Sequence, residues 1–402
     1  MLRKQEASAM TFINDILWRV IRTKPFDTVR PKIIRAHSYR LEGQIHHSKS
    51  NFSAIMLGQK ETVAFFSKLV YATKPTIRFL GKRTFSNIAS SAEKLKVDST
   101  VIETSWFFSR FLHDNGFFTS PRIDFVLDIN DSLENIQKRM AEGKRRRIRK
   151  LVKDGFTFEI TKDPVKVKSF YNEIYLPHML KRHGESAIPI SFSEYTQLLL
   201  SGYLMLIKKG PEYVSGNLLL SQGNGLRTFI TGVKNVDSEL TGGSLAAYYY
   251  AIVNGIQKGC AIMDFGETSS FMLDGNFQYK RELGAHVRPV TGPSAYVFGI
   301  RFSKASEPVM DFLSANPFVF LDGANLSGLI YLESISDLHE SCCVPGLSSL
   351  YIVSSNLDCS NQQGLKLQKL SAKNFSNQNT SALRVFNEAC NVSGYSLYRL
   401  LL

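Results

Sequence analysis

Four polar residues in the second half of the chain have types and spacing that suit proton transfer. Asp264 and Glu267 lie at the end of the apolar run 261–265, which is typical of a buried strand. Tyr279 and Lys280 follow on a short helical pattern. A carboxylate can act as a general base, and a tyrosine can protonate a leaving group. We expect these side chains to line one cleft at the C-terminal edge of a sheet, where α/β proteins commonly place their sites.

Each of these residues also has a structural explanation. Asp264 could cap the turn after its strand or form a salt bridge with Lys280, and Tyr279 could belong to the core. Lys280 could lie on the surface. His183 is a further candidate base, although a histidine just after a helical pattern is commonly a cap or a surface residue. The sequence leaves these alternatives open.

A run of basic residues is the most strongly charged feature of the chain. Segment 144–150 reads Lys-Arg-Arg-Arg-Ile-Arg-Lys, and Arg145, Arg146 and Arg149 are its candidate ligands for a substrate. Arginine suits bidentate contacts with phosphate, so the run could clamp a diphosphate or another polyanion. The same charges could instead form a solvated helix face. No aromatic residue interrupts the run, which argues against stacking on bases.

Two adjacent glycines precede another helical pattern. Gly242 and Gly243 are followed by Ser244, and apolar residues then recur at helical spacing. Free amides and the helix dipole attract anions to a helix N-terminus, and glycine lets the backbone approach a phosphate closely. The pair therefore predicts a phosphate site, with an ordinary helix-start turn as the alternative.

The composition narrows the classes of partner and of site. The 402 residues carry a formal net charge of +14, which favours an anionic partner such as a phosphate-rich ligand, nucleic acid or an acidic membrane. The five cysteines form no Cys-x-x-Cys pair, so we expect neither a disulfide framework nor a metal site. The N-terminus does not have a signal-peptide pattern, and no apolar stretch is long enough to span a membrane. We therefore expect a cytoplasmic protein.

Short apolar runs alternate with helical patterns, which indicates an α/β fold. Residues 1–29 have the spacing of an amphipathic helix, which could dock on its own domain or contact a membrane surface. One long helix is expected, capped by Asp131 or Ser132 and ending before Gly155. From residue 163 to 302 the expected order is two helices, three strands, a helix, a strand, a helix and two strands. The expected strands are 53–57, 76–80, 122–129, 156–160, 203–208, 213–221, 226–232, 261–265, 286–290, 295–302, 318–321 and 350–353.

The order from residue 163 to 302 resembles the core of the GNAT acyltransferases. Three stretches, within about residues 120 to 300, resemble the Fem-type and CelD-like branch of that superfamily. They are the basic helix at 144–153, the segment 170–184, and the segment 264–285 with its Tyr-Lys and Gly-Ala elements. The resemblance implies an α/β (α+β) protein with two tandem GNAT-like lobes around mixed central sheets, at 30–160 and 161–304. A small C-terminal α/β module at 305–402 would complete the chain.

The resemblance also implies an activity, acyl transfer from an activated donor to an amine or hydroxyl. Acyl-CoA is the expected donor, and its pyrophosphate would face the helix that begins at Gly243. The acceptor would be a small molecule or a cell-envelope precursor. Two alternatives stay open: aminoacyl transfer from tRNA by a Fem-type enzyme, and a basic nucleic-acid-binding protein without catalysis.

These arguments give one set of candidate site residues. The catalytic candidates are Asp264, Glu267, Tyr279 and His183, the donor-binding candidates are Gly242, Gly243, Ser244 and Lys280, and the substrate-binding candidates are Arg145, Arg146, Arg149, Tyr175 and Arg182.

Overall fold

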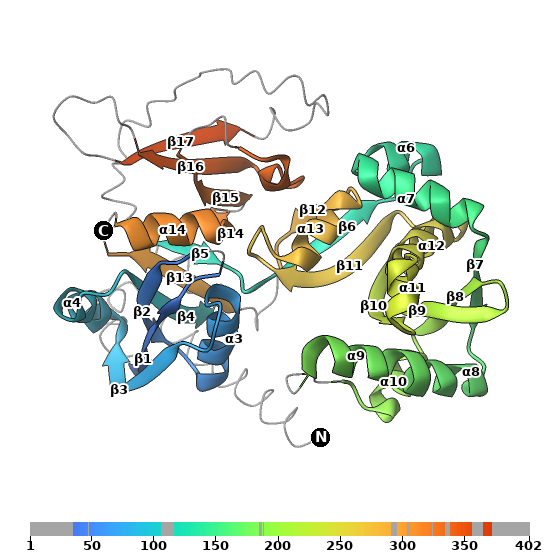
Figure 1. Ribbon diagram of the computed structural model, residues 1–402, viewed down its shortest axis with the longest axis horizontal. Helices are drawn as coiled ribbons and strands as arrows, with labels where there is room; N and C mark the ends of the chain where they lie inside the picture. Colours follow the sequence, from blue (N-terminus) through green and yellow to red (C-terminus); the bar gives the residue numbers. More distant parts are fainter. Residues whose placement is uncertain are drawn as a thin grey trace. The chain divides into compact units, whose positions relative to one another are not determined.

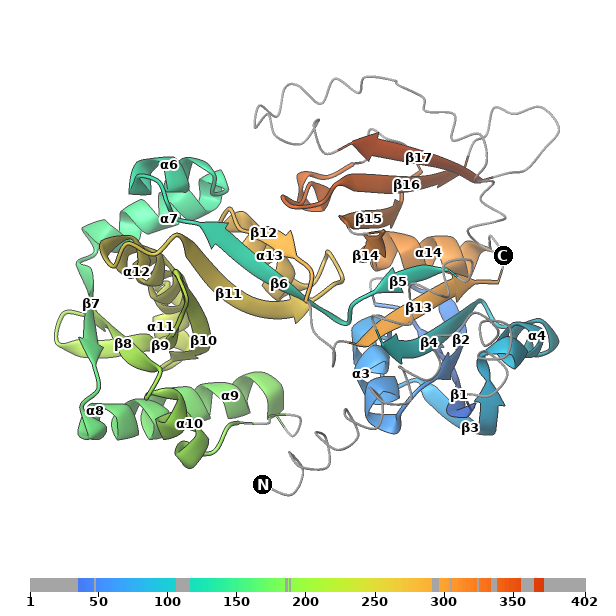
Figure 2. The ribbon, with the colours of Figure 1, turned by 180° about the vertical axis from the view of Figure 1, so that it is seen from behind.

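Three mixed sheets form the framework of the protein (Figures 1 and 2). The computed structural model describes residues 35–46, 48–105, 116–184, 187, 189–290, 296–303, 306–323, 325–333, 338–355 and 365–371. The described residues belong to two compact units. Unit 1 contains residues up to 123, 269–277 and those from 289 onward, and unit 2 contains 124–268 and 278–288. The predicted α/β class with mixed sheets is confirmed.

Unit 1 is built on a six-stranded sheet in the order β3-β1-β2-β4-β13-β5. Phe52, Phe66 and Phe298 are fully buried on this sheet and its helices. The predicted strands at 53–57 and 76–80 are confirmed, as is a helix between them. The elements are β1 (Arg35–Gln44), β2 (Asn51–Leu57), α3 (Lys60–Val70), β3 (Thr76–Thr84), α4 (Phe85–Leu95), β4 (Ser99–Ser105), β5 (Phe117–Thr119) and β13 (Tyr296–Phe302).

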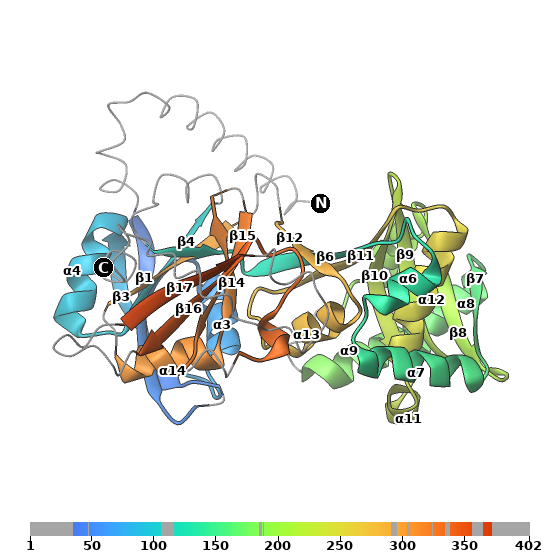
Figure 3. The ribbon, with the colours of Figure 1, turned by 90° about the horizontal axis from the view of Figure 1, so that it is seen from above.

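The described residues from 306 onward belong to unit 1. They form α14 (Glu307–Ala315), β14 (Phe318–Asp322), β15 (Asn325–Tyr331), the 3-10 turn η6 (Glu340–Cys342), β16 (Ser349–Ser355) and β17 (Leu365–Ser371). Residues of α14, β14, β15 and β16 share the core of the unit. The strands lie side by side in the order β14-β15-β16-β17, as Figure 1 shows, and Figure 3 looks down on the same sheet from above. Phe312 of α14 stacks on Phe52 with ring centroids 4.6 Å apart, and Phe117 packs edge-on against Phe318.

The contacts therefore group these residues with unit 1, although they form a sheet of their own. Apolar rings that lie about 200 residues or more apart in the sequence fill one core, and sequence pattern alone does not report such pairing. The predicted N-terminal helix at 1–29 lies outside the described residues.

Two strands belong to other sheets than the sequence order suggests. β6 (Arg122–Asp128), expected in the first lobe, pairs with β12 (His286–Arg288) in the sheet of unit 2. β13, expected in the second lobe, pairs with β4 and β5 in unit 1. The boundaries between the two units thus differ from the lobe boundaries expected after residues 160 and 304. A short apolar run shows that a strand exists but not which sheet it joins.

Unit 2 is built on a seven-stranded sheet in the order β12-β6-β11-β10-β9-β8-β7. Helix α12 packs on β8, β9 and β10, and the helices from α8 to α10 enclose a core that includes the buried side chains Phe170 and Tyr195. The remaining elements are α6 (Leu133–Lys138), α7 (Glu142–Lys153), β7 (Phe156–Thr161), α8 (Pro164–Ser169), the π-helical turn η3 (Phe170–Tyr175), α9 (Leu176–His183), α10 (Phe192–Leu198), β8 (Gly202–Lys209), β9 (Glu212–Gln222), β10 (Gly225–Val233), α11 (Val236–Leu240), α12 (Gly243–Gln257), β11 (Ile262–Ser269) and α13 (Gly275–Glu282).

The expected long helix before Gly155 is two helices, α6 and α7. Of the two predicted caps, Ser132 is the one that caps α6, because its hydroxyl accepts from the amide of Asn135 at 3.2 Å. The break follows Arg139, where the amide of Ala141 donates to the carbonyl of Glu282 at 2.9 Å. That tertiary hydrogen bond takes the place of a helical one. Among the described helices, none combines the length and apolar character needed to cross a membrane.

A carboxylate on the outer strands of unit 2 joins four elements. Glu159 of β7 pairs with Lys166 of α8 and Lys208 of β8, and it accepts from the Tyr213 hydroxyl of β9 at 3.0 Å. The hydrogen bond with Lys166, and then the one with Lys208, lower the pKa of Glu159 from 4.5 to about 2. The carboxylate therefore stays charged in mildly acidic solution.

This cluster makes the stability of unit 2 depend on pH. A pKa that is lower in the folded state stabilises the fold above pH 4.5 and loses this effect as pH falls towards about 2. We expect Glu159→Gln to lower the melting temperature at neutral pH and this deficit to shrink across that window. Thermal melts against pH measure it, with Glu212→Gln, an exposed member of another ion pair, as the control. A deficit that is independent of pH would contradict this account.

Candidate active site

The central feature of unit 2 is the point where β10 and β11 separate. These parallel strands pair at three positions, the last being Arg227 with Asp264. Both strands then continue, β10 beside β9 and β11 beside β6 (Figures 1 and 2). A register shift in β10 between Thr228 and Ile230, and a φ of 73° at Gly266 in β11, accompany the separation. Backbone groups of both strands therefore leave their shared ladder at the same level.

Lys280 is tied to β11 just beyond this point. Its side chain is 6% exposed, and its Nζ donates to the carbonyls of Gly266 at 3.0 Å and Glu267 at 2.9 Å. A buried ammonium thus acts as donor to carbonyls on the stretch of β11 that has left β10. Lys280 thus lies beside the separation, where it holds two carbonyls of β11.

Asp264 lies within β11 rather than at its end. The strand was expected to end at residue 265 but continues to Ser269, so Glu267 is an exposed strand residue. Oδ1 of Asp264 accepts a hydrogen bond from the amide of Gly266 at 2.7 Å. The backbone bends locally at this glycine, whose positive φ allows the bond to form. The expected pair with Lys280 is replaced by contacts with two arginines.

Four charged residues form a row across four neighbouring strands. Arg288 of β12 is opposite Asp124 of β6, and Asp264 of β11 is opposite Arg227 of β10. The Nη2 atom of Arg288 lies 3.4 Å from Oδ2 of Asp124 and 3.4 Å from Oδ2 of Asp264. Arg227 lies 3.6 Å from Asp264 and 4.0 Å from Asp124. We call these four residues the charge row.

The charge row lies on the sheet face opposite α12. Leu226 and Met263 face α12, where they approach the Cβ position of Gly255. Since side chains alternate along a strand, Arg227 and Asp264 point to the other face.

Aromatic residues gather on the α12 side of the separation. Tyr248 of α12 packs against Phe265 of β11 and Tyr279 of α13, with ring centroids 5.4 Å apart in each pair. Burial raises the pKa of Tyr248, while a hydrogen bond with Thr231 of β10 and the charge of Arg182 of α9 lower it. The predicted residues Tyr279 and Arg182 are thus brought near one tyrosine that the sequence did not single out.

The basic helix α7 has one buried and one exposed side. Lys144 is 6% exposed, lies 3.6 Å from the centroid of the Tyr279 ring and 3.3 Å from Oε2 of Glu282. Burial lowers the pKa of Lys144, and Glu282 opposes this effect. Arg145 is half-buried, whereas Arg146 and Arg149 are exposed.

The glycine pair forms a tight entry into α12. Gly242 is left-handed, with a φ of 99°. A Cβ on Gly243 would lie 2.7 Å from the carbonyl oxygen of Ser238, so only glycine fits there. The helix-start explanation is therefore sufficient for both glycines. Ser244 is half-buried in the first turn of α12. Leu151 of α7 lies against Gly242, which places the basic helix beside this helix start.

Two further candidates are not part of the arrangement. Tyr175 is buried in an aromatic cluster with Tyr171 and Tyr195, and its hydroxyl accepts from the amide of Ile190 at 3.2 Å. It is a core residue whose hydroxyl already has a backbone partner, and its binding of substrate stays a prediction. His183 is the last residue of α9, and its side chain lies outside the described part of the structure.

Sequence reasoning missed Asp124, Arg227, Arg288, Thr231 and Tyr248. The available signal was a charged residue inside an otherwise apolar strand, as in Arg-Ile-Asp-Phe-Val-Leu-Asp at 122–128. Charged residues are rarely buried without a partner, so such a position marks an ion pair or a site. The partner itself lies on another strand and is not visible in the sequence.

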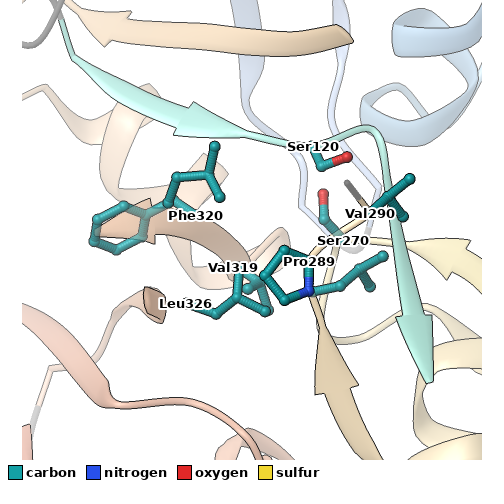
Figure 4. Close-up of a pocket in the computed structure, with 9 residues that line it drawn as sticks. Ser120, Ser270, Pro289, Val290, Val319, Phe320 and Leu326 are labelled. Atoms are coloured by element: carbon teal, nitrogen blue, oxygen red, sulfur yellow. The ribbon is translucent and has the colours of Figure 1, made fainter. Parts of the chain in front are cut away.

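A small pocket in unit 1 is lined by apolar residues and two serines (Figure 4). The Ser270 hydroxyl at this pocket accepts from Thr119 at 2.9 Å. Its lining contains no titratable side chain, so we do not assign chemistry to it. The lining residues are Ser120, Ile123, Ser270, Pro289, Val290, Val319, Phe320, Leu321 and Leu326.

Solved structures with a similar fold include both kinds of protein that the sequence resembles. FemX is 12% identical with a TM-score of 0.38, over 68% of this chain and 86% of that one. L-PGS from Bacillus licheniformis is 11% identical with a TM-score of 0.35, over 67% and 86%. A GCN5-related N-acetyltransferase from Sphaerobacter thermophilus is 12% identical with a TM-score of 0.32, over 52% and 61%. No protein-family model matches the sequence, and no curated protein is significantly similar to it.

The position of Lys280 predicts a large effect on stability. Lys280→Met removes the donor to two carbonyls, so we expect the free energy of unfolding to fall by roughly 2 kcal/mol or more. Urea unfolding measures this change, with Lys162→Met, at an exposed loop position, as the control. Equal stability of the two variants would show that Lys280 does not hold β11.

Proposed function

We propose that unit 2 transfers an acyl group from an activated, phosphate-bearing donor to an amine or hydroxyl. The observation that carries the proposal is the separation of β10 and β11 beyond Arg227 and Asp264. A carbonyl held between two parted parallel strands can accept from amides that have left the ladder. The order of elements from β7 to α13, which is the GNAT order, supports the same proposal.

Tyr248 is the proposed proton donor to the leaving group. Burial raises the pKa of its hydroxyl, so the phenol remains protonated at neutral pH, the form that a general acid needs. Its position between Phe265 and Tyr279 places it next to the stretch of β11 that has left β10. The leaving sulfur or oxygen of the donor would take the phenolic proton as its bond to the acyl carbon breaks.

The phosphate groups of the donor are assigned to the start of α12 and the neighbouring face of α7. A helix N-terminus favours an anion, and Val233 at the end of β10 lies near Gly243, so this helix start is close to the parted strands. Arg146, Arg147 and Arg149 are exposed and form no ion pair with any described carboxylate. Their charges are therefore available to a ligand.

Acyl-CoA and aminoacyl-tRNA both carry an activated acyl group and phosphates. Acyl-CoA is the first donor that we propose, and the exposed charge of α7 favours aminoacyl-tRNA as the second. The acceptor would be a small molecule or a cell-envelope precursor. Both donors are made in the cytoplasm, where the proposal places the protein.

The charge of α7 can be tested without knowledge of the acceptor. We expect the triple change of Arg146, Arg147 and Arg149 to Gln to lower donor affinity by roughly tenfold at low salt and to reduce its salt dependence. Calorimetric titration with acetyl-CoA, and separately with tRNA, measures both. The control changes Lys60, Lys68 and Lys74 of unit 1 to Gln, which removes the same charge from exposed positions. An identical salt slope in both triple variants would mean that α7 is only a solvated face.

The general-acid role of Tyr248 predicts a selective loss of turnover. We expect Tyr248→Phe to lower thiol release from acetyl-CoA in the presence of mixed primary amines by about a hundredfold while donor affinity is kept. Tyr249→Phe is the matched control, because the hydroxyl of Tyr249 forms its hydrogen bond with Gln137 instead. Equal rates for the two tyrosine variants would remove Tyr248 from the mechanism.

A further inference from the structure

We propose that Asp124 and Asp264 form the binding site for the acceptor as a primary amine, and that Arg288 occupies this site until the amine arrives. The inference rests on the proposed function and names the substrate class of the same site. It assigns roles to the buried charges of the charge row, which the account of the donor leaves unused.

One carboxylate oxygen of the charge row has no hydrogen-bond donor within reach. Asp124 is 8% exposed, and its Oδ1 is buried without a hydrogen bond. Arg227 Nη2 lies 4.0 Å from that oxygen, beyond hydrogen-bond reach. A buried carboxylate oxygen without a donor is costly, so the site favours a ligand that brings N–H groups. An ammonium group has three such donors.

Arg288 is the member of the row that can leave. Its side chain is 46% exposed, and one nitrogen bridges both aspartates at 3.4 Å instead of forming a paired fork with either. It lies on β12, a three-residue strand at the edge of the sheet. A half-exposed guanidinium regains water when it swings away, so replacing it costs little.

The charge row is placed for the attack on the donor. Asp264 is in the last residue pair before β10 and β11 separate, so an amine held by the two aspartates is next to the proposed acyl carbonyl. The bound ammonium gives one proton to Asp124, and the neutral nitrogen attacks the carbonyl carbon. A carbon–nitrogen bond forms and the carbon–sulfur or carbon–oxygen bond of the donor breaks. The nitrogen then loses its second proton to water, and the leaving group takes the proton of Tyr248.

Direct binding of a simple amine tests the proposal apart from turnover. The probe is n-butylammonium, observed by saturation-transfer NMR, with n-butanol and tetramethylammonium as ligands that lack charge or N–H donors. We expect the amine alone to bind, about tenfold more weakly to Asp124→Asn and more tightly to Arg288→Gln, where the competing cation is gone. Asp128→Asn, on the same strand but exposed and paired with His286, should bind like the parent.

Either of two results with n-butylammonium would overturn the proposal: unchanged affinity in Asp124→Asn, or no gain in affinity in Arg288→Gln. Binding of acetate to the parent that is lost in Arg288→Gln would also overturn it, because the charge row would then be an anion site. If Asp124→Asn does not fold, the half-exposed Arg288→Gln decides the question alone. Amine binding with no acyl transfer from any donor would contradict the proposed function but not the amine site. Acyl transfer to hydroxyls alone, without amine binding, would contradict the amine site but not the proposed function.

Discussion

The structure of unit 2 depends on one constraint, that β10 and β11 share three residue pairs and then separate. A parallel ladder normally satisfies the backbone groups of both strands, so leaving it creates a need for other partners. Lys280 meets part of that need at the carbonyls of Gly266 and Glu267. The proposed function uses the backbone groups that the separation leaves unpaired, and functional sites commonly retain such costly local arrangements.

The charges around the separation are of two kinds. Asp124, Asp264 and Lys144 are buried charges with charged partners, and removing the partners of such a group leaves an unpaired ion in a poorly solvated place. The exposed arginines of α7 have no such partners among the described residues, so their replacement affects ligands more than folding. The buried, paired charges thus stabilise the fold around the proposed site, and the exposed arginines are the ones proposed to bind the phosphates of the donor.

Much of unit 2 was predictable because its elements are locally encoded. The apolar runs gave the positions of β7 to β11, and Gly242 and Gly243 correctly marked the start of α12. The partner of β6, the break between α6 and α7, and the charge row depend on contacts between distant segments. Asp264 was found from its place in the sequence, but Arg227 and Asp124 become its neighbours only through strand pairing. Tyr175 shows another limit, because its motif in the sequence does not reveal that its side chain is buried in the core.

Hydrogen exchange in the presence of acetyl-CoA, followed by mass spectrometry, tests the central claim most directly. Donor between β10 and β11, with its phosphates at α12, would cover backbone amides of both. The account predicts slower exchange in peptides that contain 228–233 and 242–248, and no change in β14–β17 of unit 1. Binding of acetyl-CoA with unchanged exchange in both of those segments, or with protection confined to unit 1, would contradict it.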